Sequence, residues 1–253
     1  MPNLKILPPE PPSYMARMPK SARRHLDVDT VLMDALTATN HPTKYAALVA
    51  YHRLESTVAA AKRQRRRIAQ GKRTLAKQLD ARKHPGPLRA LAGLFHDVDF
   101  YVVCRARIAK LSKFLSQRTR FQRLGRVLRR YRSELDQMIR ARDHLEHFEE
   151  RLPGGSRRNK LRNPSDLFNI AGDHMTFGGE RFDVGPTNLS MLTDFVSELR
   201  AALLYDALDV LAAIDQGLLV RRVQEAYRDA ALPRLMKRAQ VAFLAATRQS
   251  ASG

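Results

Sequence analysis

The sequence predicts an all-α protein, an elongated antiparallel helical bundle with one inserted β-hairpin. Three observations predict it. Ala, Leu and Arg dominate the 253 residues, and all three favour helix. Apolar residues recur at steps of three and four over long stretches, which is the period of an amphipathic helix. Short breaks rich in Pro and Gly separate these stretches, and long helices joined by short loops usually become antiparallel neighbours.

The first 26 residues are expected to form a flexible Pro-rich arm, because clustered prolines disfavour helix and favour extended chain. The prolines are Pro8, Pro9, Pro11 and Pro12. Residues 27–250 are expected to form a single helical bundle domain. Its first helix is short, at about 27–37, and precedes a break at His41-Pro42-Thr43.

Three long helices are expected next, at about 44–82, 88–117 and 121–152. Each carries an apolar stripe at helical spacing. The Pro/Gly-containing runs 84–87 and 153–155 end the first and the third, since these residues interrupt helices.

The period then changes from that of a helix to that of a strand. Apolar and polar residues alternate on both sides of Gly178-Gly179, which predicts a β-hairpin with strands near 167–177 and 180–184. Met175, Phe177 and Phe182 are expected on its buried face. A long helix from Asn188 or Ser190 to about 219 follows, and a last helical piece at about 221–247 is expected to kink at Pro233.

The charge indicates a polyanionic partner. The net charge is +20, which suits RNA, DNA or an anionic membrane surface. Two basic runs could form a continuous groove for a phosphate backbone, and RNA or another polyanion is the expected partner. The residues predicted to bind nucleic acid are Lys62, Arg63, Arg66, Arg67, Arg73, Arg123, Arg126 and Arg130. The alternative is an ordinary solvated face. Few aromatic residues lie among these cations, so base stacking is not indicated.

Several other classes of site are not expected. Cys104 is the only cysteine, which excludes an intramolecular disulfide and the common zinc frameworks, and its apolar neighbours indicate a packing role. Asp97 and Asp99 are two residues apart on a helix and point to different faces, so neither a metal nor a cofactor is expected. No leader or membrane-spanning segment is recognisable, which predicts a cytoplasmic protein with no membrane partner.

One stretch suggests chemistry. Residues at alternating steps of four and three form the stripe of the helix 121–152, namely Leu124, Leu128, Tyr131, Leu135, Met138, Arg142 and Leu145. Arg142 is its one charged member, and an arginine on a buried stripe is costly unless it is paired or lines a site. Asp143 adjoins Arg142, and His147 follows five positions after it.

The stretch 138–155, MIRARDHLEHFEERLPGG, resembles the Arg-x4-6-His pattern of the HEPN superfamily, and it is similar to the matching helix of uncharacterised bacterial helical proteins. The resemblance covers about 44–152. It implies a metal-independent ribonuclease of toxin or phage-defence type. Arg142 would bind the scissile phosphate, His147 would transfer protons and Asp143 would orient it, in a homodimer whose motifs converge.

A structural role for Arg142 is the alternative. An ion pair with Glu146, Asp206, Asp209 or Asp215 would hold the register of the bundle. On a straight helix Arg142 and His147 lie about 140° apart, which does not bring them together within one chain. The sequence therefore predicts an RNA-associated HEPN-like protein, with a non-catalytic nucleic-acid-binding or protein-interaction module as the alternative.

Overall fold

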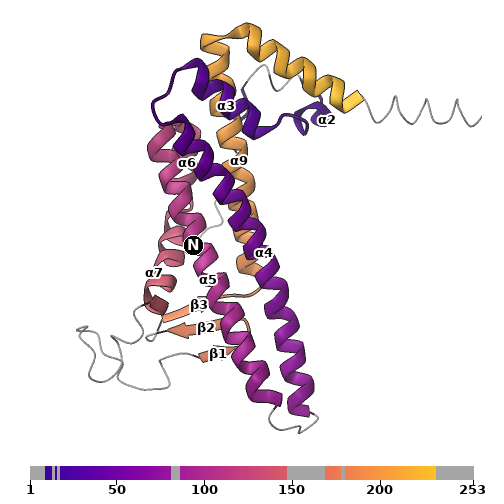
Figure 1. Cartoon of the computed structure of the whole chain (residues 1–253), viewed down its shortest axis with the longest axis vertical. Coiled ribbons are helices and arrows are strands. Elements are labelled where there is room, and N and C mark those ends of the chain that lie inside the picture. The colour runs from indigo at the N-terminus through magenta and orange to yellow at the C-terminus, as the bar shows by residue number, and fades with distance from the viewer. Residues whose placement is uncertain are drawn as a thin grey trace, which may run out of the picture. The chain divides into compact units, whose positions relative to one another are not determined.

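The computed structural model describes residues 9–12, 15, 18–80, 86–146, 169–177 and 180–231 (Figure 1). These residues are mainly helical and include one small antiparallel sheet, which confirms an all-α bundle with an inserted hairpin. They fall into two compact units, residues 45–199 and residues 1–44 with 200–253. Each unit is described by itself.

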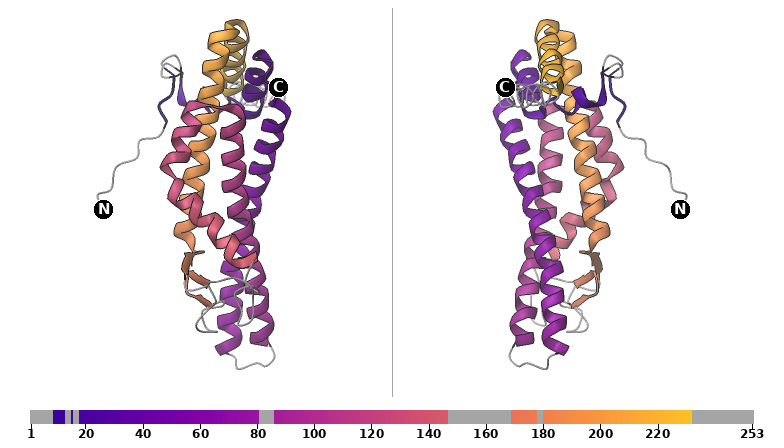
Figure 2. Two further views of the ribbon diagram at one scale, coloured as in Figure 1. Left: turned by 90° about the vertical axis from the view of Figure 1, so that its left-hand side faces the viewer. Right: turned by 90° about the vertical axis from the view of Figure 1, so that its right-hand side faces the viewer.

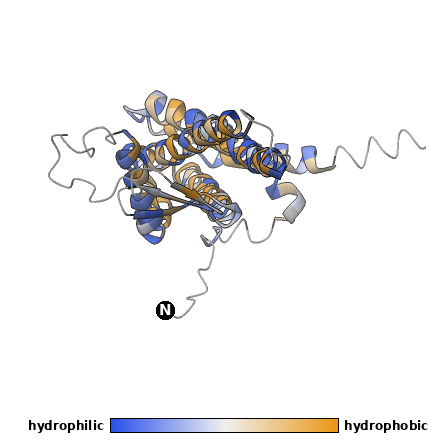
Figure 3. Ribbon diagram, turned by 90° about the horizontal axis from the view of Figure 1, so that it is seen from below, coloured by the Kyte–Doolittle hydropathy of each residue, from blue (hydrophilic) through white to orange (hydrophobic). Residues whose placement is uncertain are grey.

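Two long helices form one side of the 45–199 unit. Helix α4 (Lys44–Asp80) and helix α5 (Gly86–Thr119) run antiparallel and lie side by side in each view (Figures 1 and 2). They approach closely at Gly71, where a Cβ would lie in van der Waals contact with Leu94 Cδ1, at 3.4 Å. Each ribbon carries both hydrophobic and hydrophilic residues, as expected for helices half-covered by neighbours (Figure 3).

The prediction of one continuous helix at 121–152 is wrong, because the structure has two helices there. Helix α6 (Gln122–Arg130) ends at Tyr131, whose φ of −93° and ψ of 17° leave the helical region, and helix α7 (Arg132–Glu146) follows. Helix α9 (Pro186–Ile214) holds Tyr131 in place. The Tyr131 ring packs edge-on against Phe195 at 5.1 Å, and the Tyr131 hydroxyl donates to Glu198 Oε1 at 3.0 Å. A tertiary contact therefore overrides the local helical pattern.

The sheet confirms the predicted hairpin and adds a third strand. Strands β1 (Asn169–Ala171), β2 (His174–Phe177) and β3 (Glu180–Asp183) pair antiparallel in that order. Met175 and Phe182 stand opposite each other and are buried. The single strand predicted at 167–177 is wrong, because Gly172, at a φ of 57°, turns the chain between β1 and β2.

The other unit contains α2 (Lys20–Arg23), α3 (Val28–Ala38), the end of α9 (Pro186–Ile214) and a helix at 216–231. α9 begins at Pro186, two residues earlier than expected, and proline suits the first helical position. It ends at Ile214 instead of about 219, because Asp215 Oδ1 accepts a hydrogen bond from Leu218 N at 2.9 Å and caps the next helix.

Within this unit, the described part of the expected flexible arm is packed. Met15, Met18 and Ala22 are buried, and Arg23 Nε donates to Met18 O at 2.9 Å. The expected kink at Pro233 lies outside the described residues.

Candidate nucleic-acid interface

An exposed basic stripe runs along α4. We define the α4 stripe as Arg63, Arg66, Arg73 and Lys77, which lie on one helical face together with Gln70 and are all exposed. The steps of three and four keep these side chains within about 80° of arc over about 21 Å of helix. No acid occurs among the five positions. A face with this spacing presents cations at regular intervals to one side of the helix.

Neighbouring cations on α4 are used differently. Arg67 is exposed, but its Nε lies 2.8 Å from Oδ1 of the buried Asp97 and joins α4 to α5. Lys62 is half-buried. Arg65 is buried, with Nη2 3.7 Å from Asp173 Oδ1. Of the residues predicted to bind on α4, three therefore lie in the stripe, Arg67 joins two helices and Lys62 is half-buried. Lys77 joins the stripe although it was not among the predicted residues.

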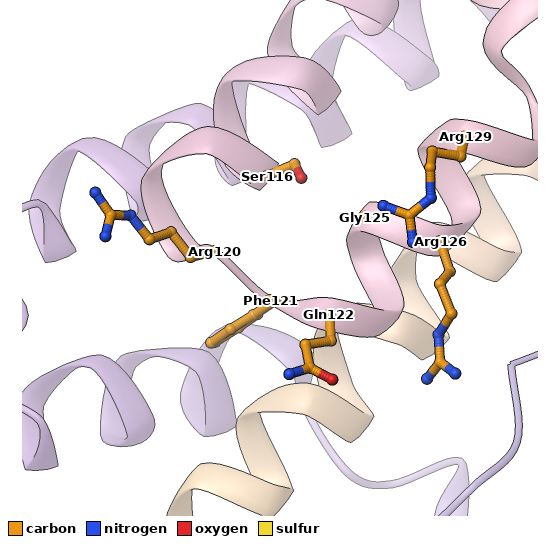
Figure 4. A pocket seen from close by; sticks show the side chains of 7 residues that line it. All are labelled: Ser116, Arg120, Phe121, Gln122, Gly125, Arg126 and Arg129. Carbon is orange, nitrogen blue, oxygen red and sulfur yellow. The ribbon is translucent and has the colours of Figure 1, made fainter.

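A second basic region occupies the corner between α5 and α6. A cavity of about 370 Å³ lies there (Figure 4). We call it the corner pocket; it is lined by Ser116, Arg120, Phe121, Gln122, Gly125, Arg126 and Arg129. In Figure 4 the Ser116 hydroxyl and the Arg129 guanidinium face the gap at Gly125, whereas the side chains of Arg120 and Arg126 extend away from it on opposite sides. The lining has three cations and no acid.

The backbone at this corner is unusual. Arg120 follows the last residue of α5 at a φ of 55°, the left-handed region in which helices usually place glycine. The N-cap of α6, Phe121, has an apolar side chain and supplies no side-chain hydrogen bond. A Cβ at Gly125 would lie 3.8 Å from Arg129 Nη1 and 3.9 Å from Ser116 Oγ. Any side chain longer than alanine there would enter the gap.

The other two residues predicted in this region do not line the pocket. Arg130 forms an ion pair with Glu198 on α9, and its guanidinium lies 5.5 Å from the centre of the Tyr131 ring. Arg123 is half-buried. Of Arg123, Arg126 and Arg130, only Arg126 is a lining residue.

The α4 stripe and the corner pocket are separate. The Arg67–Asp97 ion pair places the stripe beside the first half of α5. Asp97 and Arg120 are 23 positions apart, which is about 35 Å along a helix. Among the described residues, the two basic regions therefore do not form the continuous groove that was expected.

Arg142 meets one of the acids that were considered for a structural role, within its own helix. It is half-exposed and forms an ion pair with Glu146, one turn along α7. Asp143 is exposed, and His147 lies outside the described residues. Ala141 and His144 occupy the buried positions of α7 instead, so the expected inward position of Arg142 is wrong by one residue.

The buried histidine of α7 was not singled out by the sequence. His144 packs against the ring of Phe182 at 5.7 Å between centres, and its Nε2 lies 3.6 Å from Glu180 Oε1. It joins α7 to the sheet. The sequence signal, in retrospect, is the run of steps of three from Leu135 through Met138 and Ala141 to His144.

A buried arginine joins α5 to the same sheet. Arg105 is 2% exposed, and its Nη1 donates to Asp183 O at 2.9 Å. Its guanidinium lies 5.7 Å from the centre of the Tyr101 ring, and the Tyr101 hydroxyl donates to Asn188 Oδ1 at 3.1 Å. Burial lowers the pKa of Arg105 and raises the pKa of Tyr101. These contacts hold the sheet against α5.

Other site classes find little support. Among the described residues, no group of three or more His, Cys, Asp and Glu side chains could hold a metal ion. Within the same ranges, no helix has the length and apolar character needed to cross a membrane. Cys104 is buried, and burial raises the pKa of its thiol, which keeps it protonated and agrees with a packing role.

Comparisons with known proteins return no relative: no family model, no curated protein and no solved structure matches the chain.

Proposed function

We propose that the protein binds RNA through the phosphate backbone, using the α4 stripe. The observation that carries this proposal is four exposed cations on one helical face, with no acid among them. Each strand of a double helix carries one phosphate per about 3.4 Å of its axis, so about 21 Å of α4 faces roughly six phosphates. Lys and Arg contacts to phosphates supply affinity without reading sequence.

The chemistry of the stripe favours backbone contacts over base contacts. No aromatic residue lies among its five positions, so it offers no platform on which bases could stack. We infer RNA as the nucleic acid from the resemblance of residues 138–155 to the HEPN pattern. A DNA strand of the same length and sequence serves as the comparison that tests this choice.

Binding is proposed here without cleavage. The Arg142 guanidinium, which a HEPN-like nuclease would use to hold the scissile phosphate, is in an ion pair with Glu146. That pair satisfies the charge that would otherwise attract a phosphate. Cleavage of RNA in EDTA that disappears in Arg142→Ala and His147→Ala would instead establish the ribonuclease.

The test compares two variants that lose the same charge in different places. Arg66→Gln/Arg73→Gln removes two cations from the α4 stripe, whereas Arg221→Gln/Arg228→Gln removes two exposed cations from the helix at 216–231. Affinity for a fluorescent RNA strand is measured by anisotropy in EDTA, with the strand length checked on a gel afterwards. The stripe variant should bind about tenfold or more weakly than wild type, and the control should bind like wild type. Equal losses in both variants would show that net charge, and not the stripe, governs binding.

A further inference from the structure

We propose that the corner pocket binds a phosphate monoester, the group found at the end of a nucleic-acid strand or on a free nucleotide. For the strand end, this inference rests on the proposed RNA binding. The pocket itself is argued from four features of the α5–α6 corner.

The first feature is the size and charge of the pocket. Its volume of about 370 Å³ lies at the lower end of the range for small-molecule sites, about 300–1,000 Å³. Arg120, Arg126 and Arg129 supply planar guanidiniums, which match phosphate oxygens with paired donors. The Ser116 hydroxyl and the Gln122 side chain add uncharged hydrogen-bonding groups.

The second feature is the lack of acidic partners for these three arginines among the described residues. None of them forms a salt bridge with a described residue, whereas Arg67 pairs with Asp97 and Arg130 with Glu198. Like charges three or four positions apart on a helix repel each other, as at Arg126 and Arg129. A bound anion with two negative charges would remove this repulsion.

The third feature is the backbone at Arg120. A glycine would adopt its φ of 55° without strain, yet the position carries a cation. Strained backbone of this kind is often retained where a side chain has a function. The guanidinium of Arg120 would reach the pocket by ordinary side-chain rotation, which is fast for exposed residues.

The fourth feature is the start of α6, a helix of nine residues whose N-cap residue, Phe121, has an apolar side chain that caps no amide. Amide groups at a helix start attract anions, and this start lies at the pocket through Phe121 and Gln122. The helix start supports the site, and the three arginines and the cavity define it.

The pocket is better suited to a monoester than to an internal phosphodiester. A terminal phosphate is linked to a sugar on one side only, so it can enter a concave site. It also carries a charge of about −1.5 to −2 at pH 7, against −1 for a phosphodiester. Three cations around one cavity fit the higher charge.

The experiment compares one RNA strand, labelled at its 3′ end, with either a 5′-phosphate or a 5′-hydroxyl. Wild type should bind the phosphorylated strand about tenfold more tightly, which corresponds to about 1.4 kcal/mol. Gly125→Glu, which places a carboxylate in the gap, should abolish this preference. Gly93→Glu is the matched control. Gly93 lies on α5, and a Cβ there would face open space, with no neighbouring side chain within 4 Å. This control variant should retain the preference.

A second variant separates binding from folding. Arg120→Gly removes one guanidinium and relieves the strain of the backbone, so it should weaken the 5′-phosphate preference while the protein melts at no lower temperature than wild type.

A competition experiment then identifies the source of the phosphate, with a nucleoside 5′-monophosphate and inorganic phosphate as competitors. If the mononucleotide removes the preference, a free nucleotide also occupies the pocket; if neither competitor does so and the preference persists, the strand end is the ligand.

The failure of this inference differs from the failure of the proposed function. If wild type binds both strand ends with equal affinity and neither competitor has an effect, the proposed phosphate site in the corner pocket is overturned. The proposed RNA binding by the α4 stripe is then unaffected. Absence of binding to either strand would overturn RNA binding. In that case, the melting temperature is measured with and without the mononucleotide. A rise for wild type but not for Gly125→Glu would still support the corner pocket, and no rise for wild type would overturn it.

Discussion

The left-handed backbone at Arg120 predicts an increase in stability on mutation to glycine. Arg120 has a φ of 55°, and a residue with a Cβ in this region costs about 1–2 kcal/mol relative to glycine. Glycine also gains about 0.5–1 kcal/mol of backbone entropy in the unfolded chain, which opposes folding. The net expectation for Arg120→Gly is an increase of about 0.5–1 kcal/mol in the free energy of unfolding.

The matched control is Arg120→Ala. It removes the same charge and the same side-chain atoms beyond Cβ, so relief of repulsion among the arginines is equal in both variants. Only Arg120→Gly removes the Cβ that strains the backbone. Urea unfolding followed by circular dichroism measures both, and the glycine variant should be the more stable by about 0.5–1 kcal/mol. Equal stability of the two variants would refute the strain and weaken its use as evidence for a site.

Three further predictions concern the fold. Phe182→Ala should reduce the free energy of unfolding, measured in urea, by about 3–5 kcal/mol, because its ring is buried. Arg181→Ala, at the neighbouring exposed position, should change it by less than about 0.5 kcal/mol. Asp215→Ala should lower the free energy of unfolding by about 1 kcal/mol in the same assay, because it removes a helix cap. Asp215→Asn should stay close to wild type, because its side-chain oxygen can still accept the hydrogen bond from Leu218 N. Burial raises the pKa of Asp99 from 3.8 to about 6, so its ionised form is disfavoured in the fold and stability should fall as pH rises from about 4 to 7. Asp99→Asn should reduce that fall; an unchanged pH profile would show that Asp99 is not its source.

Most of the fold follows from local periodicity. Apolar spacing predicted α3, α4, α5 and α9 to within a few residues, because each buries one stripe against neighbours. The break between α6 and α7 could not be predicted, since Tyr131 leaves the helix to meet Phe195 and Glu198, which lie far along the chain. The turn at Gly172 was missed because a strand pattern continued through it.

The candidate sites were predictable only in part. The sequence predicted Arg63, Arg66 and Arg73 as nucleic-acid-binding residues. Burial and ion pairing in the folded chain decide which of the neighbouring cations belong to the same stripe. Arg65 is buried and Arg67 is paired, although both belong to the same basic run. Of the residues that line the corner pocket, the sequence predicted only Arg126 as a binding residue. The turn that forms the pocket gave no sequence signal, because position 120 carries an arginine where a glycine would have predicted it.

The salt dependence of RNA affinity tests the central claim most directly. Each phosphate neutralised on a single strand contributes about −0.7 to the slope of log K against log salt, so engagement of the four cations of the α4 stripe predicts a contribution of about −2.8. Measured between about 50 and 200 mM salt, the slope should become less negative by about 1.4 in Arg66→Gln/Arg73→Gln and stay as in wild type in Arg221→Gln/Arg228→Gln. A slope that is unchanged in the stripe variant, or that changes equally in both variants, would contradict the account.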